Sequence, residues 1–168
     1  AKLTNADGST FTIADVAART NALVSGEVDY MDRCDLKTLS MLKASSDLDI
    51  TQTTGYGHYI LAMITNVAPF DNPDVRNAIK FAIDREEISQ KVFAGINPPG
   101  NDNPIAPSVK FATNPEPIHK YDPERAKSLL KKAGLEKLSI DLSVADIAFA
   151  GAVDTGTLIR EQAKAAGI

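Results

Sequence analysis

Two helix starts follow one another in Pro69-Phe70-Asp71-Asn72-Pro73-Asp74-Val75-Arg76-Asn77-Ala78-Ile79-Lys80-Phe81-Ala82-Ile83-Asp84-Arg85-Glu86-Glu87. The prolines remove backbone donors, and Pro73 fits the first position of a helix, where no donor is needed. An apolar stripe at helical spacing follows, made of Val75, Ala78, Ile79, Ala82 and Ile83. Asp84 and Glu87 then have the spacing of a capping box, which predicts a second helix that ends at Gly95.

Upstream of this stretch, helices and strands are predicted to alternate. Turn residues 5–9 separate two short segments that can pair as a hairpin. Asp15 caps a helix that stops at Gly26, and Asp35 caps another that carries leucines at positions 36, 39 and 42. Short strands are expected over 28–31 and 48–50, and the apolar run 59–65 favours a strand buried on both faces. This order predicts an α/β layer.

Downstream, a long irregular segment separates the central helices from a second α/β unit. Six prolines in residues 96–121 exclude a continuous helix or strand and favour an extended course over the surface. Asp122-Pro123 starts a helix that closes at Gly134, and the alternation over 138–144 predicts a half-buried strand. A last helix is expected over 154–166. Such a helix ordinarily leads to a further strand, so we expect the unit to continue beyond Ile168.

Composition excludes several functional classes. The net charge of -4 and the absence of a basic cluster argue against a nucleic-acid partner. Cys34 is the single cysteine, so no internal disulfide is possible. No run approaches the roughly twenty apolar residues of a membrane span. Residues 1–4 do not resemble a signal peptide, so a secreted protein would carry its signal outside this chain.

The patterns of metal and catalytic sites are also absent from the sequence. Cys34, His58 and His119 lack paired ligand spacing, and the aspartates at 29, 32 and 35 lack the alternation and glycine of a calcium loop. Neither a Gly-x-Ser-x-Gly elbow nor a phosphate-binding Gly-x-x-x-x-Gly-Lys-Ser/Thr loop occurs. We therefore expect no metal, no cofactor and no covalent chemistry.

Five phrases occur in a fixed order along nearly the whole chain. They are Ala22-Leu23-Val24-Ser25-Gly26-Glu27-Val28-Asp29, Pro69-Phe70-Asp71-Asn72-Pro73-Asp74-Val75-Arg76-Asn77-Ala78-Ile79, Ala82-Ile83-Asp84-Arg85, Tyr121-Asp122-Pro123-Glu124-Arg125-Ala126-Lys127-Ser128-Leu129-Leu130 and Ala133-Gly134-Leu135. Each phrase alone also describes a capped helix or a turn. Together they closely resemble the family 5 extracellular solute-binding proteins, which serve dipeptide, oligopeptide and nickel ABC importers.

The resemblance implies an α/β fragment of a two-lobe clamshell of the periplasmic-binding-protein type II. Residues 1–66 would belong to lobe I, with the strand from Tyr59 to Asn66 crossing the hinge, and residues 67–168 to lobe II. Family members are much longer, so the chain would be a middle portion of a periplasmic protein that is a monomer when complete. That protein would capture a peptide or similar small solute and deliver it to a membrane permease.

Two segments are candidates for solute contact once the family position is considered. The stretch 55–59 precedes the crossing strand, so Tyr56, His58, Tyr59 and then Asn66 can line the cleft; a turn with surface aromatics is the alternative. Asp146 and Phe149 follow a strand end, where α/β sheets often present ligands. Peptide-binding relatives often carry Arg and Tyr there, so this departure weakens the case for binding a peptide carboxylate. Asp146 instead favours a cation or a hydroxyl-rich ligand, or simply a structural turn.

Two other classes of function stay open at this point. The chain can be the non-catalytic lobe of a hydrolase or transferase, which turnover of a substrate by the complete protein would indicate. It can also be a stand-alone interaction domain, which a monomeric, cooperatively folded chain without an exposed apolar face would indicate. Saturable binding without turnover would favour solute transport.

Overall fold

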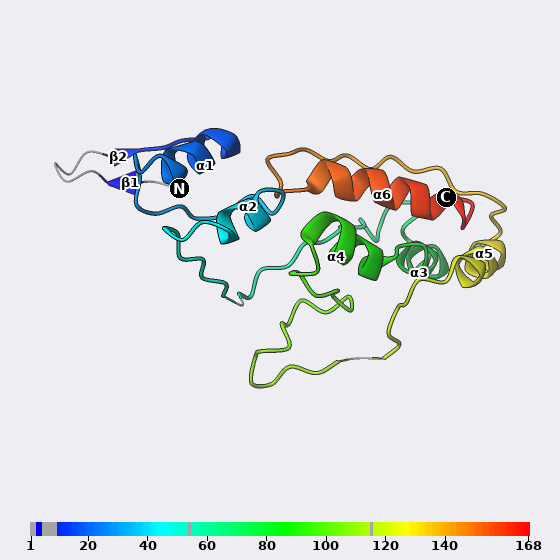
Figure 1. The fold of residues 1–168 in the computed structure, drawn as a ribbon. Helices are drawn as coiled ribbons and strands as arrows, with labels where there is room; N and C mark the ends of the chain where they lie inside the picture. The colour runs from blue at the N-terminus through cyan, green and yellow to red at the C-terminus, as the bar shows by residue number, and fades with distance from the viewer. Residues whose placement is uncertain (1–2, 5–9, 54, 115) are drawn as a thin grey trace. The chain divides into compact units, whose positions relative to one another are not determined.

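The computed structural model describes residues 3–4, 10–53, 55–114 and 116–168. The chain forms two compact units, Ala1–Thr53 and Thr54–Ile168 (Figure 1). The predicted lobe boundary lies near Asn66, whereas the segment 55–66 belongs to the second compact unit. The assignment of residues 1–66 and 67–168 to two lobes stays a prediction.

The first unit contains a small hairpin and two helices. Strands β1 (Leu3–Thr4) and β2 (Thr10–Phe11) pair antiparallel, while the expected turn 5–9 lies outside the described residues. Helix α1 (Val16–Val24) begins as predicted, because the Asp15 carboxylate accepts a hydrogen bond from the backbone N–H of Ala18 at 2.7 Å. Gly26 follows it with φ +73°.

Helix α2 (Leu39–Lys43) is shorter than predicted. The Asp35 carboxylate accepts from the N–H of Lys37 at 3.0 Å, which forms a local turn, and the helix starts only after Thr38. The strands expected over 28–31 and 48–50 are wrong, since both segments are irregular.

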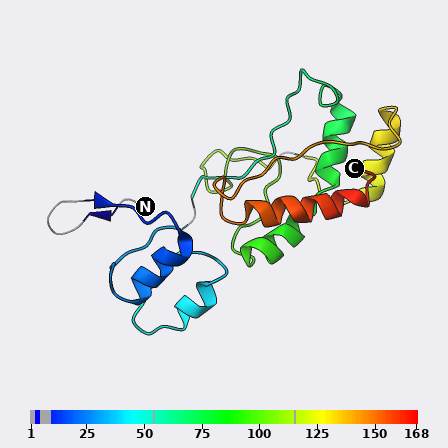
Figure 2. The same ribbon diagram turned by 90° about the horizontal axis from the view of Figure 1, so that it is seen from above.

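Four helices build the second unit, in two side-by-side pairs. Helix α3 (Pro73–Phe81) contacts α5 (Pro123–Lys132), and α4 (Arg85–Phe93) contacts α6 (Ala152–Lys164) (Figures 1 and 2). The starts of the first three were predicted from their caps, and Asn72, Asp84 and Asp122 each accept a backbone N–H of the first turn. Helix α6 begins two residues before the predicted position.

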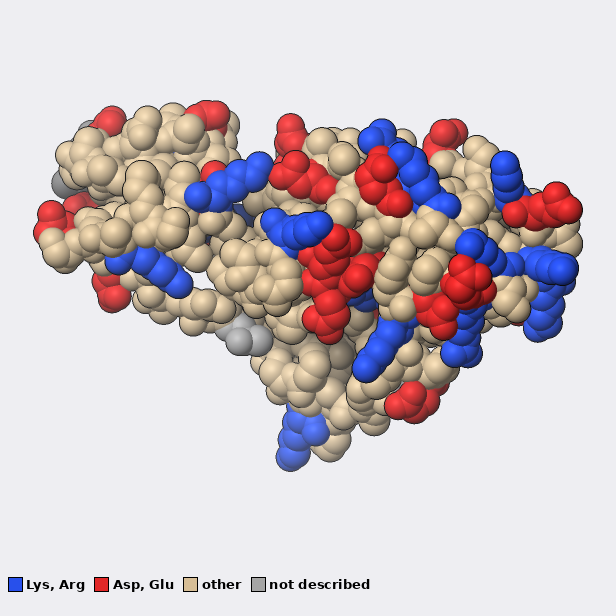
Figure 3. Space-filling view, turned by 45° about the vertical axis from the view of Figure 1, so that its right-hand side comes forward, with Lys and Arg blue, Asp and Glu red and all other residues tan. Residues whose placement is uncertain are grey.

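The core of this unit lies where α3 meets α5. The predicted stripe of α3 is buried, and its tightest positions face the equally buried side of α5; the fully buried residues are Val75, Ala78, Ala126 and Leu130. Burying one such aliphatic side chain contributes roughly 1.5–3 kcal/mol. Charged residues occupy the outer faces, where both signs are interspersed in pairs such as Lys132–Asp74 and Lys127–Glu124 (Figure 3).

The segments 59–65 and 138–144 were predicted as strands, and both predictions are wrong for the described structure. They are extended without ladder partners, and Ile60 in the supposedly buried strand is 70% exposed. Leu138 is buried and its N–H donates to the carbonyl of Gly167 at 3.0 Å, but Leu142 and Val144 are partly exposed. The α/β class is therefore not confirmed: within the described ranges the strands are limited to the hairpin of the first unit.

A buried glutamine joins α6 to the start of α4. Gln162 Oε1 accepts the N–H of Asp84 at 3.0 Å, while its Nε2 donates to the Asp84 carbonyl at 3.2 Å and to Glu87 Oε2 at 2.7 Å. Only 7% of the residue is exposed. Its backbone carbonyl also accepts the hydroxyl of Tyr121 at 3.2 Å. All polar atoms of the amide are thus used between elements far apart in the sequence.

Gln162→Ala is expected to destabilise the chain by about 2 kcal/mol, because it removes a buried side chain and leaves the half-buried N–H of Asp84 without its acceptor. Urea unfolding followed by circular dichroism measures this difference. Gln90→Ala, on the exposed side of α4, is the matched control and should change stability by less than about 0.5 kcal/mol. Equal midpoints for the two variants would contradict the role assigned to Gln162.

Candidate functional site

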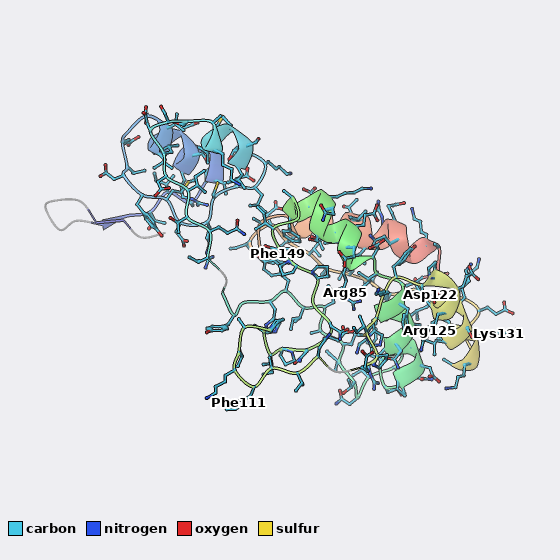
Figure 4. All side chains as sticks on the ribbon, turned by 60° about the horizontal axis from the view of Figure 1, so that its bottom comes forward. Arg85, Phe111, Asp122, Arg125, Lys131 and Phe149 are labelled. Atoms are coloured by element: carbon cyan, nitrogen blue, oxygen red, sulfur yellow. The ribbon has the colours of Figure 1, made fainter. Side chains whose placement is uncertain are left out.

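Three aromatic rings from separate elements meet in the second unit. Tyr59 of the extended segment stacks on Phe149 with ring centroids 4.0 Å apart and planes 15° apart. Phe93, at the end of α4, lies 5.7 Å from Tyr59 and 6.2 Å from Phe149. Figure 4 shows Phe149 in front of the first turn of α6. We call Tyr59, Phe93 and Phe149 the aromatic cluster.

A groove of about 350 Å³ lies beside the aromatic cluster. Its walls come from both extended segments and from one face of α6; the lining residues are Ile60, Leu61, Leu142, Ser143, Val144, Ala145, Ala148, Phe149, Ala152, Thr155, Gly156 and Ile159. None of them is charged. A groove of this composition favours an apolar part of a ligand and disfavours a charged group, which would lose its hydration there without a partner.

The wall of the groove contains one unused polar group. The hydroxyl of Thr155 is buried and has no hydrogen-bond partner within the described structure. A buried hydroxyl without a partner is unfavourable, so a polar atom placed within its reach would gain a hydrogen bond.

Two glycines of α6 allow the walls to approach this closely. Gly151 precedes the helix with φ +88°, and a Cβ there would lie 2.6 Å from a methyl group of Val92 on α4. Gly156 faces Val144, whose methyl carbons would lie 3.0 and 3.1 Å from an added Cβ. The first glycine sets the turn that follows Phe149, and the second admits the segment 138–144 against the helix.

The structure brings together two of the six residues proposed from the sequence, Tyr59 and Phe149. The other four, Tyr56, His58, Asn66 and Asp146, are exposed and take no part in the aromatic cluster or the groove lining. Their contact with a solute stays a prediction.

Sequence reasoning missed Phe93, Leu142 and Val144 as parts of the site. Phe93 was assigned only to the end of a helix, although an apolar residue just before a stop glycine is a signal for contact with the following turn. Leu142 and Val144 belong to the alternating run 138–144, which was predicted only as a half-buried strand.

Chemistry other than binding finds little support in the described residues. They hold no group of three or more His, Cys, Asp or Glu side chains that could bind a metal ion. Burial raises the pKa of the Cys34 thiol, and Asp35 raises it further, so the thiol is protonated at neutral pH. The helices of the described part of the chain are too short or too polar to cross a membrane.

Comparison with known sequences places these features in a family context. The profile of the bacterial extracellular solute-binding proteins, family 5 (middle part), matches residues 1–168. Glutathione-binding protein GsiB of Escherichia coli K12 is 30% identical over 122 residues, which are 73% of this chain and 23% of that protein. Heme-binding protein A of Haemophilus influenzae Rd is also 30% identical over 122 residues, 73% of this chain and 22% of that protein. The chain therefore spans less than a quarter of the length of these curated relatives.

Solved structures share the fold. NikA of Staphylococcus aureus, in complex with Ni(L-His)2, superposes with a TM-score of 0.69 at 21% identity, over 95% of this chain and 34% of that one. MoaA of A. tumefaciens R10, in complex with mannopinic acid, gives 0.61 at 22% identity, over 94% and 32%. These matches are consistent with the expected fragment of a two-lobe clamshell.

Gly151→Ala is expected to destabilise the second unit by about 1–3 kcal/mol, because it combines a left-handed backbone with a steric overlap against Val92. It should also disturb the Tyr59–Phe149 stack, which near-ultraviolet circular dichroism detects. Gly100→Ala is the control, since no heavy atom lies within 4 Å of a Cβ there and its φ is not positive. A Gly151 variant as stable as the Gly100 variant would disprove the constraint.

Proposed function

Because the chain belongs to the bacterial extracellular solute-binding proteins of family 5, we propose that it supplies part of the solute-binding surface in the substrate-binding component of an ABC importer. The complete protein is proposed to act in the periplasm as a monomer, to close two lobes around a solute and to deliver it to a membrane permease. The conclusion rests on one structural observation in particular, the stack of Tyr59 on Phe149 beside an uncharged groove.

The groove supports binding of a solute through apolar and stacking contacts. Stacked or tilted aromatic pairs contribute about 0.5–1.5 kcal/mol beyond the burial of their area. Tyr59 is 56% exposed, so one side of the cluster can still receive a ligand. Thr155 adds a hydroxyl that can bond a polar atom of the same ligand. We therefore propose a peptide-like or other small solute that carries an apolar portion.

Two lobes that close on a solute must be joined by chain segments that cross the hinge, and the proposed crossing segment is Tyr59 to Asn66. Its first residue carries the aromatic ring of the cluster, and His58 and Tyr56 precede it directly. Closure would bring these exposed side chains over the solute, because a ligand shifts the protein toward the state that it binds more tightly. No catalytic role is proposed for any residue.

Binding by the full-length protein that carries this chain tests the proposal. Isothermal titration calorimetry is run with reduced glutathione, the dipeptide Ala-Phe and Ni(L-His)2 as probes, and the recovered solute is checked by mass spectrometry. We expect saturable binding of at least one probe without chemical change. Tyr59→Ala and Phe149→Ala should each weaken that binding about tenfold, which corresponds to roughly 1.4 kcal/mol.

Matched variants outside the groove serve as controls. Tyr30→Ala and Phe111→Ala remove exposed aromatic rings that belong neither to the cluster nor to the groove lining, and both should bind like the unmodified protein. Conversion of the probe into a product, or equal affinities for all four variants, would contradict the proposed function.

A further inference from the structure

Hydrogen bonds join the two limbs of the proline-rich loop 96–121, although its described residues form neither helix nor strand. Asn101 Nδ2 donates to Asn114 Oδ1 at 3.0 Å, and Asn103 Nδ2 donates to the carbonyl of Thr113 at 2.7 Å. The N–H of His119 lies 3.4 Å from Asn101 Oδ1, its acceptor. The two limbs of the loop are therefore joined, and they carry an exposed tip on which Phe111 points away from the helices (Figure 4).

The Asp102 carboxylate holds this closed loop to the ends of two helices, and Ser89 Oγ of α4 also donates to the carbonyl of Asn97 at 2.6 Å. Asp102 Oδ1 accepts from Arg85 Nη2 at 3.0 Å, and Asp102 Oδ2 lies 2.8 Å from His119 Nδ1 and 3.8 Å from Lys80 Nζ. Arg85 Nη1 also donates to the carbonyl of His119 at 2.7 Å. Two residues of the loop are thus held by the end of α3 and the first residue of α4.

The imidazole of His119 is enclosed in this arrangement. Its side chain is only 8% exposed, and the ring packs against Phe81 with centroids 4.8 Å apart. Its Nδ1 lies close to the carboxylate but makes no hydrogen bond of good geometry with it. The contact is thus a short electrostatic one, without the full strength of an aligned hydrogen bond.

Burial disfavours protonation of the imidazole; the nearest charge, the Asp102 carboxylate, favours it, and two cations oppose it. Lys80 of α3 and Arg85 of α4 are cations, and Asp102 is the one anion in contact with the ring; Arg125 of α5 lies 4.3 Å from the centre of the Phe81 ring. When His119 is neutral, Asp102 and the two cations that contact it, Lys80 and Arg85, carry a net charge of +1. Protonation would place a second excess positive charge in a largely buried cluster, which is unfavourable.

We propose that Asp102, His119 and Arg85 form a pH-sensitive clasp, which holds the loop 96–121 on α3 and α4 at neutral pH and releases it in mild acid. The clasp belongs to the loop and its helices alone, so it does not depend on the identity of the solute or on the lining of the groove.

The direction of the effect follows from the two states of His119. Burial lowers its pKa in the clasped state; Asp102 opposes this, and Lys80 and Arg85 reinforce it. In the released loop the imidazole is solvated, and its pKa returns to about 6.5. The clasp is therefore fully stable above about pH 6.5 and weakens as the pH falls toward the pKa of the clasped state. In that window the ratio of released to clasped loop rises by up to about tenfold per pH unit.

Hydrogen–deuterium exchange of the protein between pH 7.5 and 5.0 tests the clasp, with rates corrected for the intrinsic effect of pH on amide exchange. Peptides from residues 96–121 should lose protection below about pH 6.5, by up to about tenfold per pH unit, while the buried part of α3 keeps its protection. Asp102→Asn should leave the loop unprotected across the whole range, because it removes the anion that holds both cations.

Two histidine variants separate the clasp from a general acid effect. His119→Asn keeps a donor near the position of Nδ1 but cannot titrate, so its loop exchange should not depend on pH. His58→Asn, at the exposed histidine, should retain the pH dependence of the unmodified protein. Loop protection that is independent of pH in the unmodified protein, or an unchanged pH dependence in His119→Asn, would overturn the proposal.

A direct titration keeps the test decisive if the His119 variant fails to fold. Nuclear magnetic resonance of the His119 imidazole in the unmodified protein should give a pKa below the ordinary value of about 6.5. A His119 pKa at or above 6.5 would overturn the clasp.

Discussion

One buried amide, Gln162, fixes α6 against the start of α4 by using its oxygen and both of its N–H groups. Gln162 holds the backbone of Asp84 from both sides, through the N–H and the carbonyl, and reaches Glu87 one turn further along. An amide that bonds both groups of one residue fixes the distance and the rotation of the two helices together. The same residue receives the hydroxyl of Tyr121, just before α5. The polar contacts of α6 with the start of α4 and with Tyr121 therefore converge on one residue, whereas α3 and α5 pack through a buried apolar interface.

The position of the groove follows from this convergence. Because α4 and α6 are fixed at the Gln162 end, the opposite end of α6 places Gly151 against Val92, and Phe149 emerges directly before it. The Asp122 N–H donates to the carbonyl of Phe81 at 2.8 Å, which connects the α3–α5 pair to the end of the proline-rich loop. The local geometry around Phe149 thus depends on the Gly151–Val92 contact and on the Gln162 contacts at the other end of α6.

The sequence predicted what local interactions decide and failed where distant partners decide. Helices α1, α3, α4 and α5 could be predicted because each begins with a capping carboxylate or amide. The capping side chain accepts a backbone N–H that is at most three residues further along the chain. A strand exists only when another backbone pairs with it, so the alternation of Leu138 to Val144 could show which side chains are apolar but not whether a ladder forms. Tyr59 was proposed from the family position at the start of the expected crossing strand, and Phe149 because it follows a predicted strand end. Phe93 and the Gln162 network were missed, since their partners lie far along the chain.

The contact between Gly156 and Val144 restricts movement of the segment 138–144 along α6. A hydrogen atom at position 156 leaves a notch in α6, and the two methyl groups of Val144 fill the space that a side chain would occupy. Such an interlock resists sliding of the segment along the helix, because any shift drives the methyl groups into the flanking side chains. We therefore expect that wall of the groove to move together with α6.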